Sequence, residues 1–217
     1  MKQLNLFILA TGLLLVSQQA MAYKQLGLMA GLNWASIESD NDVSGYTGTS
    51  AESAPGFGAF LSLPIKDSGM WGLEIGITYA PKSFELDASG DKIEHDNLTE
   101  YFMIRYRQQP DSPFNFGVGL YVSQAMGDAT VTDGTSGAET ETSLGNLSGF
   151  GTEGISEEDY GAIASMQVIG NLTESMGVLI DIRYVYGLRD INEDKTSGFE
   201  LASRQIQGFA GLSFKFD

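Results

Sequence analysis

The chain has 217 residues with 27 glycines, 11% aromatic residues and no cysteine, so it fits one domain and excludes a disulfide framework or a thiolate metal site. Twenty-eight acidic residues against 12 basic ones give a formal charge of −16 at pH 7. This balance argues against nucleic acid as a partner, because phosphate contacts need a surplus of lysine and arginine.

The first 22 residues predict a secretory signal peptide. Leu6–Val16 is an apolar run that is too short to cross a bilayer as a helix, and Ala20–Ala22 forms a small-x-small cleavage site. We therefore expect export, cleavage between Ala22 and Tyr23, and a single mature domain over residues 23–217. No later stretch approaches 18 apolar residues in succession, so no helical membrane span is expected.

Eight downstream segments alternate apolar residues with small or polar ones, which is the period of half-buried strands. Each is about ten residues long, the length that a tilted strand needs to cross the hydrocarbon core of a membrane. The predicted strands are Gln25–Ala35, Gly56–Ile65, Trp71–Lys82, Leu98–Gln108, Phe114–Ser123, Tyr160–Ile169, Val178–Gly187 and Gln205–Phe216.

The connections between these segments alternate between short and long. The short ones are Lys66–Met70, Pro110–Pro113 and Asn171–Gly177. The long ones are Ser36–Pro55, Ser83–Asn97, Gln124–Asp159 and Leu188–Arg204. An even strand number with short periplasmic turns and longer outer loops predicts an eight-stranded antiparallel up-and-down transmembrane β-barrel in the outer membrane.

The alternation also fits a secreted lipocalin-like barrel, whose apolar face points inward. Two features favour the membrane barrel. The face opposite the apolar residues is rich in glycine, which suits the crowded interior of a narrow barrel better than a solvated exterior. Aromatic residues on the apolar face gather at strand ends, as membrane-interface girdles require. The predicted interface aromatics are Trp34, Trp71, Tyr79, Tyr106, Phe116, Tyr160, Tyr184, Tyr186, Phe214 and Phe216.

Two stretches resemble a known family of barrels, and a third resembles a barrel-assembly signal. Arg183–Ile191 (RYVYGLRDI) resembles the R-Y-x-x-G-L-x-D/N-I segment of the PorT-like outer-membrane β-barrel domain family, and Leu73–Lys82 is similar to that family's third strand. Gly211–Phe216 resembles the terminal aromatic-x-aromatic signal that the barrel-assembly machinery reads. The resemblance implies an eight-stranded barrel, of the broader OmpA/OmpX-like type, mostly without assigned activity; some members of the family are accessories in protein secretion.

Charged residues on the small and polar face are predicted to lie inside the barrel. Ions removed from water must be paired, so we expect a network of salt bridges and hydrogen bonds that plugs the lumen. A proton or ion path is the alternative, which the side-chain-filled interior of an eight-stranded barrel disfavours. The predicted network consists of Glu74, Arg105, Arg107, Asp181 and Arg183.

Twenty-one of the 28 acidic residues fall in the four long connections. A solvated surface is the simpler interpretation. Divalent-cation binding is the alternative, because carboxylate oxygens suit Ca²⁺. Ala51 and Lys195 interrupt the two stretches that begin like EF-hand loops, so no metal site or cofactor is assigned. The acids that could supply ligands are Asp40, Asp42, Glu52, Asp190 and Asp194.

Catalysis has little support in the sequence. His95 is the only histidine, and we expect it in an exposed loop that also holds Ser83 and Ser89. A serine and a histidine without a fixed geometry do not make a nucleophile and its base. We therefore expect a non-enzymatic protein with a structural or surface-interaction role. Its expected partners are outer-membrane lipid and, during biogenesis, the assembly machinery.

Three other functions remain open. The first is an accessory subunit of a secretion or surface-assembly complex, with a stable protein partner. The second is a small channel, and the third is a lipid-modifying enzyme that depends on His95.

Overall fold

The computed structural model describes residues 24–39, 49–65, 69–87, 89–109, 112–147, 154–192 and 200–216. The predicted cleavage site at Ala22 and Tyr23 lies outside these residues. The elements are β1 (Lys24–Ser39), β2 (Thr49–Pro64), β3 (Trp71–Tyr79), β4 (Lys82–Leu86), β5 (Lys92–Tyr106), β6 (Phe114–Thr132), β7 (Glu139–Thr142), η1 (Leu144–Asn146), β8 (Glu158–Asn171), β9 (Met176–Gly187) and β10 (Leu201–Phe216). No helix in the described part of the chain is long and apolar enough to cross a membrane.

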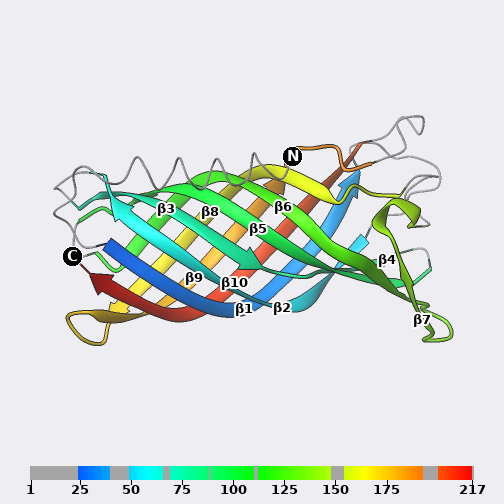
Figure 1. Ribbon diagram of the computed structural model, residues 1–217, viewed down its shortest axis with the longest axis horizontal. Helices are drawn as coiled ribbons and strands as arrows, with labels where there is room; N and C mark the ends of the chain where they lie inside the picture. Colours follow the sequence, from blue (N-terminus) through cyan, green and yellow to red (C-terminus); the bar gives the residue numbers. More distant parts are fainter. Residues whose placement is uncertain are drawn as a thin grey trace.

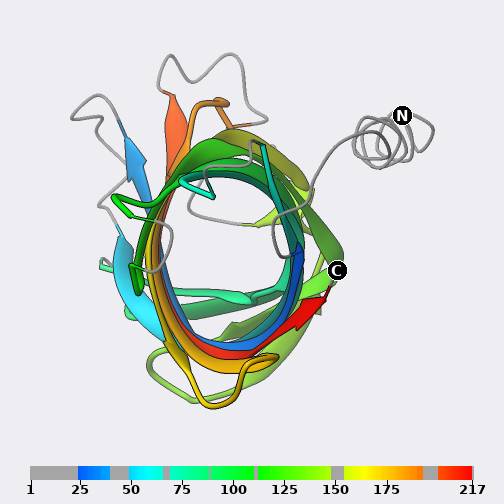
Figure 2. The ribbon, with the colours of Figure 1, turned by 90° about the vertical axis from the view of Figure 1, so that its left-hand side faces the viewer.

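The strands close into a barrel, which is visible end-on in Figure 2. Every neighbouring pair is antiparallel, and β1 pairs with β10 from Lys24 opposite Phe216 to Ser39 opposite Leu201. Eight strands cross the barrel; β4 continues the line of β3, and β7 pairs only with β6 in the described chain. The predicted eight-stranded antiparallel barrel is therefore confirmed.

The two ends of the barrel differ. The described parts of the short connections and the end of β10 lie at one end, on the left of Figure 1, and we name this the turn end. The described parts of the long connections, with β4 and β7, lie at the other end, which we name the loop end. The strands cross the barrel wall obliquely between these ends, as the tilt of a closed sheet requires.

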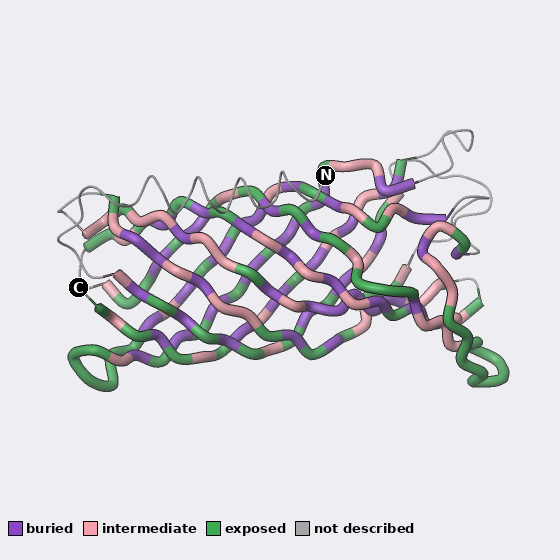
Figure 3. Tube along the Cα trace, in the orientation of Figure 1, coloured by how far each residue is buried: buried purple, intermediate pink, exposed green. Residues whose placement is uncertain are grey.

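Residues alternate between the lumen and the outer surface along each strand (Figure 3). On β9 the buried Leu179, Asp181 and Arg183 alternate with the exposed Ile180 and Ile182. The outside of the barrel is apolar and the inside mixes polar with apolar side chains. This is the arrangement of a barrel that crosses a membrane, and the reverse of a soluble lipocalin-like barrel.

Pairing continues beyond the predicted strands at the loop end. The predicted strand Trp71–Lys82 is interrupted at Ala80 and Pro81, since proline has no N–H for the ladder, and β4 then resumes between β2 and β5. β5 begins at Lys92 and β6 extends to Thr132. The boundaries predicted for the loops at residues 83–97 and 124–159 were therefore wrong, because the hydrogen-bond ladder extends into polar sequence.

A second apolar core closes the loop end. Residues of the third long connection, including Leu144 and Leu147, are buried there against strand residues such as Phe84 and Ile93. Asn192 pairs with Ile155 in an isolated bridge, which ties the fourth long connection to the third. Apolar side chains of the acidic connections thus pack against the strands, which the expectation of simple solvated loops did not include.

Gly76 illustrates why the lumen needs small residues. It lies opposite Tyr101 in the register of β3 and β5, and a β-carbon on Gly76 would overlap the Tyr101 ring. We expect Gly76→Ala to lower the free energy of unfolding by about 1–3 kcal/mol, as overpacking of a filled core does. Urea unfolding in micelles would measure it. Gly170→Ala is the matched control, because a β-carbon there meets nothing within 4 Å, and an equal loss in both variants would contradict the argument.

Candidate functional site

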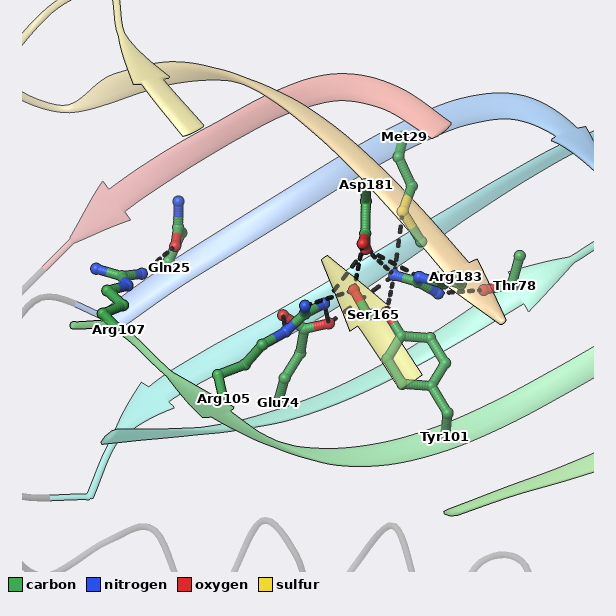
Figure 4. A network of polar contacts seen from close by, with 10 residues as sticks. All are labelled: Gln25, Met29, Glu74, Thr78, Tyr101, Arg105, Arg107, Ser165, Asp181 and Arg183. Atoms are coloured by element: carbon green, nitrogen blue, oxygen red, sulfur yellow. Dashed lines mark hydrogen bonds and ion pairs between the residues drawn. The ribbon is translucent and has the colours of Figure 1, made fainter. Parts of the chain in front are cut away.

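Four of the five predicted interior charges form one network in the middle of the lumen (Figure 4). Arg105 on β5 donates two hydrogen bonds to Glu74 on the neighbouring β3, from Nε at 2.9 Å and from Nη2 at 2.7 Å. The same Nη2 reaches Asp181 Oδ2 on β9 at 3.2 Å. Ser165 on β8 joins the network, since it accepts from Arg105 Nη1 at 2.6 Å and donates to Asp181.

Arg183 completes this network and is fully buried. Its Nε donates to Asp181 Oδ2 at 2.9 Å, and its Nη2 donates to the Tyr101 hydroxyl at 2.8 Å. The guanidinium carbon lies 5.3 Å from the centre of the Phe209 ring. Two arginines and two carboxylates give the network zero net charge, which is the condition for keeping ions in an interior of low dielectric.

Arg107 lies apart from this network, toward the turn end (Figure 4). It donates from Nε to Asn115 Oδ1 and from Nη2 to Gln25 Oε1, the latter at 3.5 Å. No ion pair joins Arg107 to an acidic residue in the described chain. The expectation that it shares the network of Arg105 was therefore wrong, because two residues along a tilted strand move a side chain to a different level of the lumen.

A second polar cluster lies in the lumen nearer the loop end. Lys82 Nζ on β4 and Asp159 Oδ2 on β8 form a buried ion pair at 3.2 Å. Tyr121 donates its hydroxyl to the same oxygen at 2.9 Å, and Ser203 also donates to it. The sequence pattern does not predict this cluster, because Lys82 and Asp159 stand at the predicted borders between strand and loop.

His95 is buried on β5 rather than exposed in a loop, so that expectation was wrong. Its Nδ1 lies 2.6 Å from Asn97 Nδ2, and its ring meets Phe84 edge-on at 6.4 Å. Neither Ser83 nor Ser89 forms a hydrogen bond with it: Ser83 Oγ is buried without a hydrogen-bond partner among the described residues, and Ser89 donates to Asp91.

The burial of His95 predicts a pH dependence of stability. His95 lies outside the membrane-spanning part of β5, because it is three residues closer to the loop end than Leu98, which pairs with the interfacial Tyr79. Burial, aided by the Lys82 ammonium, lowers the pKa of His95 from 6.5 to about 3. The unfolded chain therefore binds this proton more tightly, so stability that is present above pH 6.5 is lost as the pH falls toward 3.

We expect a loss of about 2 kcal/mol at pH 5 from this residue. Urea unfolding of the wild type and His95→Gln at neutral pH and at pH 5 would measure it. The variant should be relatively more stable at the lower pH. A difference between the two proteins that stays constant with pH would contradict the assignment.

The acids considered as metal ligands do not come together in the described structure. Glu52 lies 3.7 Å from Lys92 across the strand surface. Asp190 Oδ1 accepts the backbone N–H groups of Asn192 and Leu201, each at 3.0 Å. No cluster of three potential ligands is found among the described residues. The remaining candidates, Asp40, Asp42 and Asp194, lie outside the described residues.

The predicted interface aromatics lie on the outer surface. Most are exposed, and Tyr79 is half-buried. Trp71 and Tyr106 are in contact at the turn end with ring centres 4.8 Å apart, and Phe57 stacks on Tyr79 toward the loop end at 5.0 Å. Arg204 covers the Tyr186 ring at 3.6 Å. The barrel thus carries aromatic groups toward both ends of its apolar surface, where a membrane would present its two interfaces.

Comparison with known proteins gives likenesses of fold alone. No family model matches the chain, and no curated protein matches it. Among solved structures, Ail of Yersinia pestis superposes with a TM-score of 0.49 at 12% identity, covering 89% of this chain and 100% of that chain. OprG of Pseudomonas aeruginosa superposes with a TM-score of 0.48 at 16% identity, covering 90% and 96%. Neisserial surface protein A gives 0.41 at 16% identity, covering 88% and 97%.

Proposed function

We propose that the protein is a closed outer-membrane barrel that acts through its loop end and does not conduct solutes through its lumen. The observation that carries this proposal is a buried network that side chains from three strands, β3, β5 and β9, assemble inside the lumen: Glu74, Arg105, Asp181 and Arg183. Large side chains, including Phe60, Tyr101 and Met103, fill the space around it. Eight strands leave room for little more than such a filling.

The outer surface supports the placement in the outer membrane. Large apolar side chains such as Val118 and Leu120 are about two-thirds exposed on the barrel wall, at 65% and 64%. Exposed apolar surface of this extent needs lipid to cover it. The short connections then face the periplasm and the acidic connections face the outside, in keeping with the proposed surface role.

Planar-bilayer recording tests the closed lumen. The folded wild type, checked by the gel mobility of unboiled against boiled samples, should give no reproducible unitary conductance. Glu74→Ala with Arg105→Ala removes one ion pair and much side-chain volume, and it provides a comparison that should conduct if the network is the plug. Unitary steps of constant size in the wild type would overturn the proposal in favour of a small channel.

A role as an accessory subunit of a secretion or surface-assembly complex is the second candidate, and the hairpin of β6 and β7 favours it. β7 pairs only with β6 in the described chain, so its other edge offers unpaired backbone groups to a partner strand. The turn is ordered by Asp133, whose Oδ1 accepts Ser136 N at 2.6 Å and Thr135 N at 3.0 Å. These hydrogen bonds, that of Ser136 first, lower the pKa of Asp133.

We also propose that the chain belongs with the PorT-like barrels, because residues of the quoted motif hold structural positions. Arg183 forms the centre of the buried network, and Asp190 holds the backbone of the fourth long connection.

Cross-linking in mild detergent, compared between the wild type and a variant in which a two-residue turn replaces residues 133–142, tests the accessory role. Recovery of a partner by the wild type alone would support it; the same proteins recovered by both variants would count against it.

A further inference from the structure

A small polar cavity opens at the turn end of the lumen and belongs to neither cluster described above. Its volume is about 60 Å³, and its lining includes Gln25, Arg107, Ser112, Asn115 and Lys215. These residues come from β1, the β5–β6 turn region, the start of β6 and the end of β10. The pairing of the first and last strands therefore brings the start of β1 and the end of β10 together beside one cavity.

The cavity carries the positive charge of Arg107, and no acidic residue stands among the described residues of its lining. Arg107 binds two neutral side chains, Asn115 and Gln25, and Lys215 Nζ donates to the amide oxygen of Asn171 at 2.7 Å. The carboxylate of Glu74, deeper in the lumen, is already held by Arg105 through two hydrogen bonds. A chain of net charge −16 thus keeps Arg107 beside a cavity whose described lining residues include no carboxylate.

Two buried donors in the lining have no acceptor. Asn115 and Gln25 are 1% and 4% exposed, and the structure gives no hydrogen-bond partner to Asn115 Nδ2 or Gln25 Nε2. Arg107 explains the orientation of both amides: the guanidinium can only donate, so the amide oxygens face it and the amide nitrogens are left over. A buried N–H donor without an acceptor costs folding free energy, so an oxygen ligand that accepts from these nitrogens would be stabilising.

We propose that this cavity binds a compact oxyanion of the phosphate class. Such an ion offers acceptors to Arg107 and, once the two amide groups turn toward it, to their nitrogens. Charge-assisted hydrogen bonds of the kind that Arg107 would donate are the strong ones. The proposal goes beyond the function proposed above, because the cavity lies at the opposite end of the barrel from the acidic connections. The phosphate group comes either from a phospholipid headgroup at the periplasmic rim or from free phosphate in the periplasm.

Asn115→Asp provides the sharpest variant. It keeps the size of the side chain and places a carboxylate against Arg107, so the cavity supplies its own anion and should reject phosphate while the barrel stays folded. Arg107→Gln removes the principal cation. The matched control is Arg189→Gln at the loop end, where Arg189 pairs with Glu158 at 3.3 Å.

The binding experiment uses the full mature barrel in a phosphate-free maltoside detergent, with inorganic phosphate titrated and the phosphorus NMR line width recorded. The wild type and Arg189→Gln should broaden the signal equally. Asn115→Asp and Arg107→Gln should weaken binding by about tenfold or more, as the loss of a charged hydrogen bond implies. Gel mobility of unboiled samples shows that each variant is folded.

A second arm separates the two sources. Native mass spectrometry with phosphatidylglycerol, and with a diacylglycerol of the same chains, reports lipid adducts. A phosphatidylglycerol adduct that inorganic phosphate displaces and Asn115→Asp abolishes identifies a headgroup; phosphate binding without such an adduct identifies the free ion. Equal phosphate binding by the wild type, Asn115→Asp and Arg107→Gln, or none by the wild type together with no adduct, overturns the proposal and leaves ordered water as the occupant.

Discussion

Replacing Arg183 by methionine should lower the free energy of unfolding by about 3–5 kcal/mol, because it leaves an uncompensated charge in the lumen. The network of the wild type is neutral, with Arg105 and Arg183 facing Glu74 and Asp181. Without Arg183, one arginine faces two buried carboxylates, and Asp181 loses the Nε–H donor at 2.9 Å. Urea unfolding in detergent micelles, followed by the fluorescence of Trp34 and Trp71, measures the loss.

A double variant identifies the cause of that loss. Adding Asp181→Asn to Arg183→Met leaves Glu74 and Arg105 as a neutral pair, so the double variant should be more stable than Arg183→Met alone. The two substitutions should therefore show a clear coupling energy in a double-mutant cycle. Arg189→Met is the control, since a surface arginine contributes at most about 1 kcal/mol. Similar small losses for Arg183→Met and Arg189→Met would contradict the argument.

The wall of the barrel could be predicted from the sequence, because the period of two assigns each residue to the lumen or to the membrane. This alternation alone predicts that four charged side chains lie inside the barrel: Glu74, Arg105, Asp181 and Arg183. Their mutual contacts could not be predicted, since the alternation along a strand does not give the height of a side chain along the barrel axis. That height follows from the register and the tilt of the strands, which are properties of the closed sheet. Arg107 lies on the same face of the sheet as Arg105 and still binds different partners.

The loop end was harder to predict, although a signal for part of it is present. Counting back from Tyr101 in steps of two gives Thr99, Asn97, His95 and Ile93, and the structure buries all of them. The polarity of the stretch hid this continuation, because residues 83–97 appear as a solvated connection. For β4 no such count works, since the interruption at Ala80 and Pro81 breaks the alternation. The burial of Lys82 depends on contacts that only the folded barrel creates.

Leu120→Arg should cost about 2–4 kcal/mol of folding free energy in phosphatidylcholine vesicles, because it places a charge on the lipid-facing wall near the middle of the membrane. Leu120 is 64% exposed on β6, between Phe116 toward the turn end and Val122, which pairs with the interfacial Tyr160. Unfolding by urea, read from fluorescence and from gel mobility without boiling, gives the free energies of wild type and variant.

Met126→Arg is the matched control and separates depth from chemistry. Met126 is 49% exposed on the same strand and pairs with Asp96, beyond the level at which Tyr79 pairs with Leu98. The same arginine there should cost no more than about 1 kcal/mol, because its guanidinium reaches water or lipid headgroups. In a barrel surrounded by water, both substitutions would replace exposed apolar groups with solvated ones at little cost. A large loss at Leu120 alone therefore locates the hydrocarbon layer, whereas two small losses would contradict a membrane around this wall.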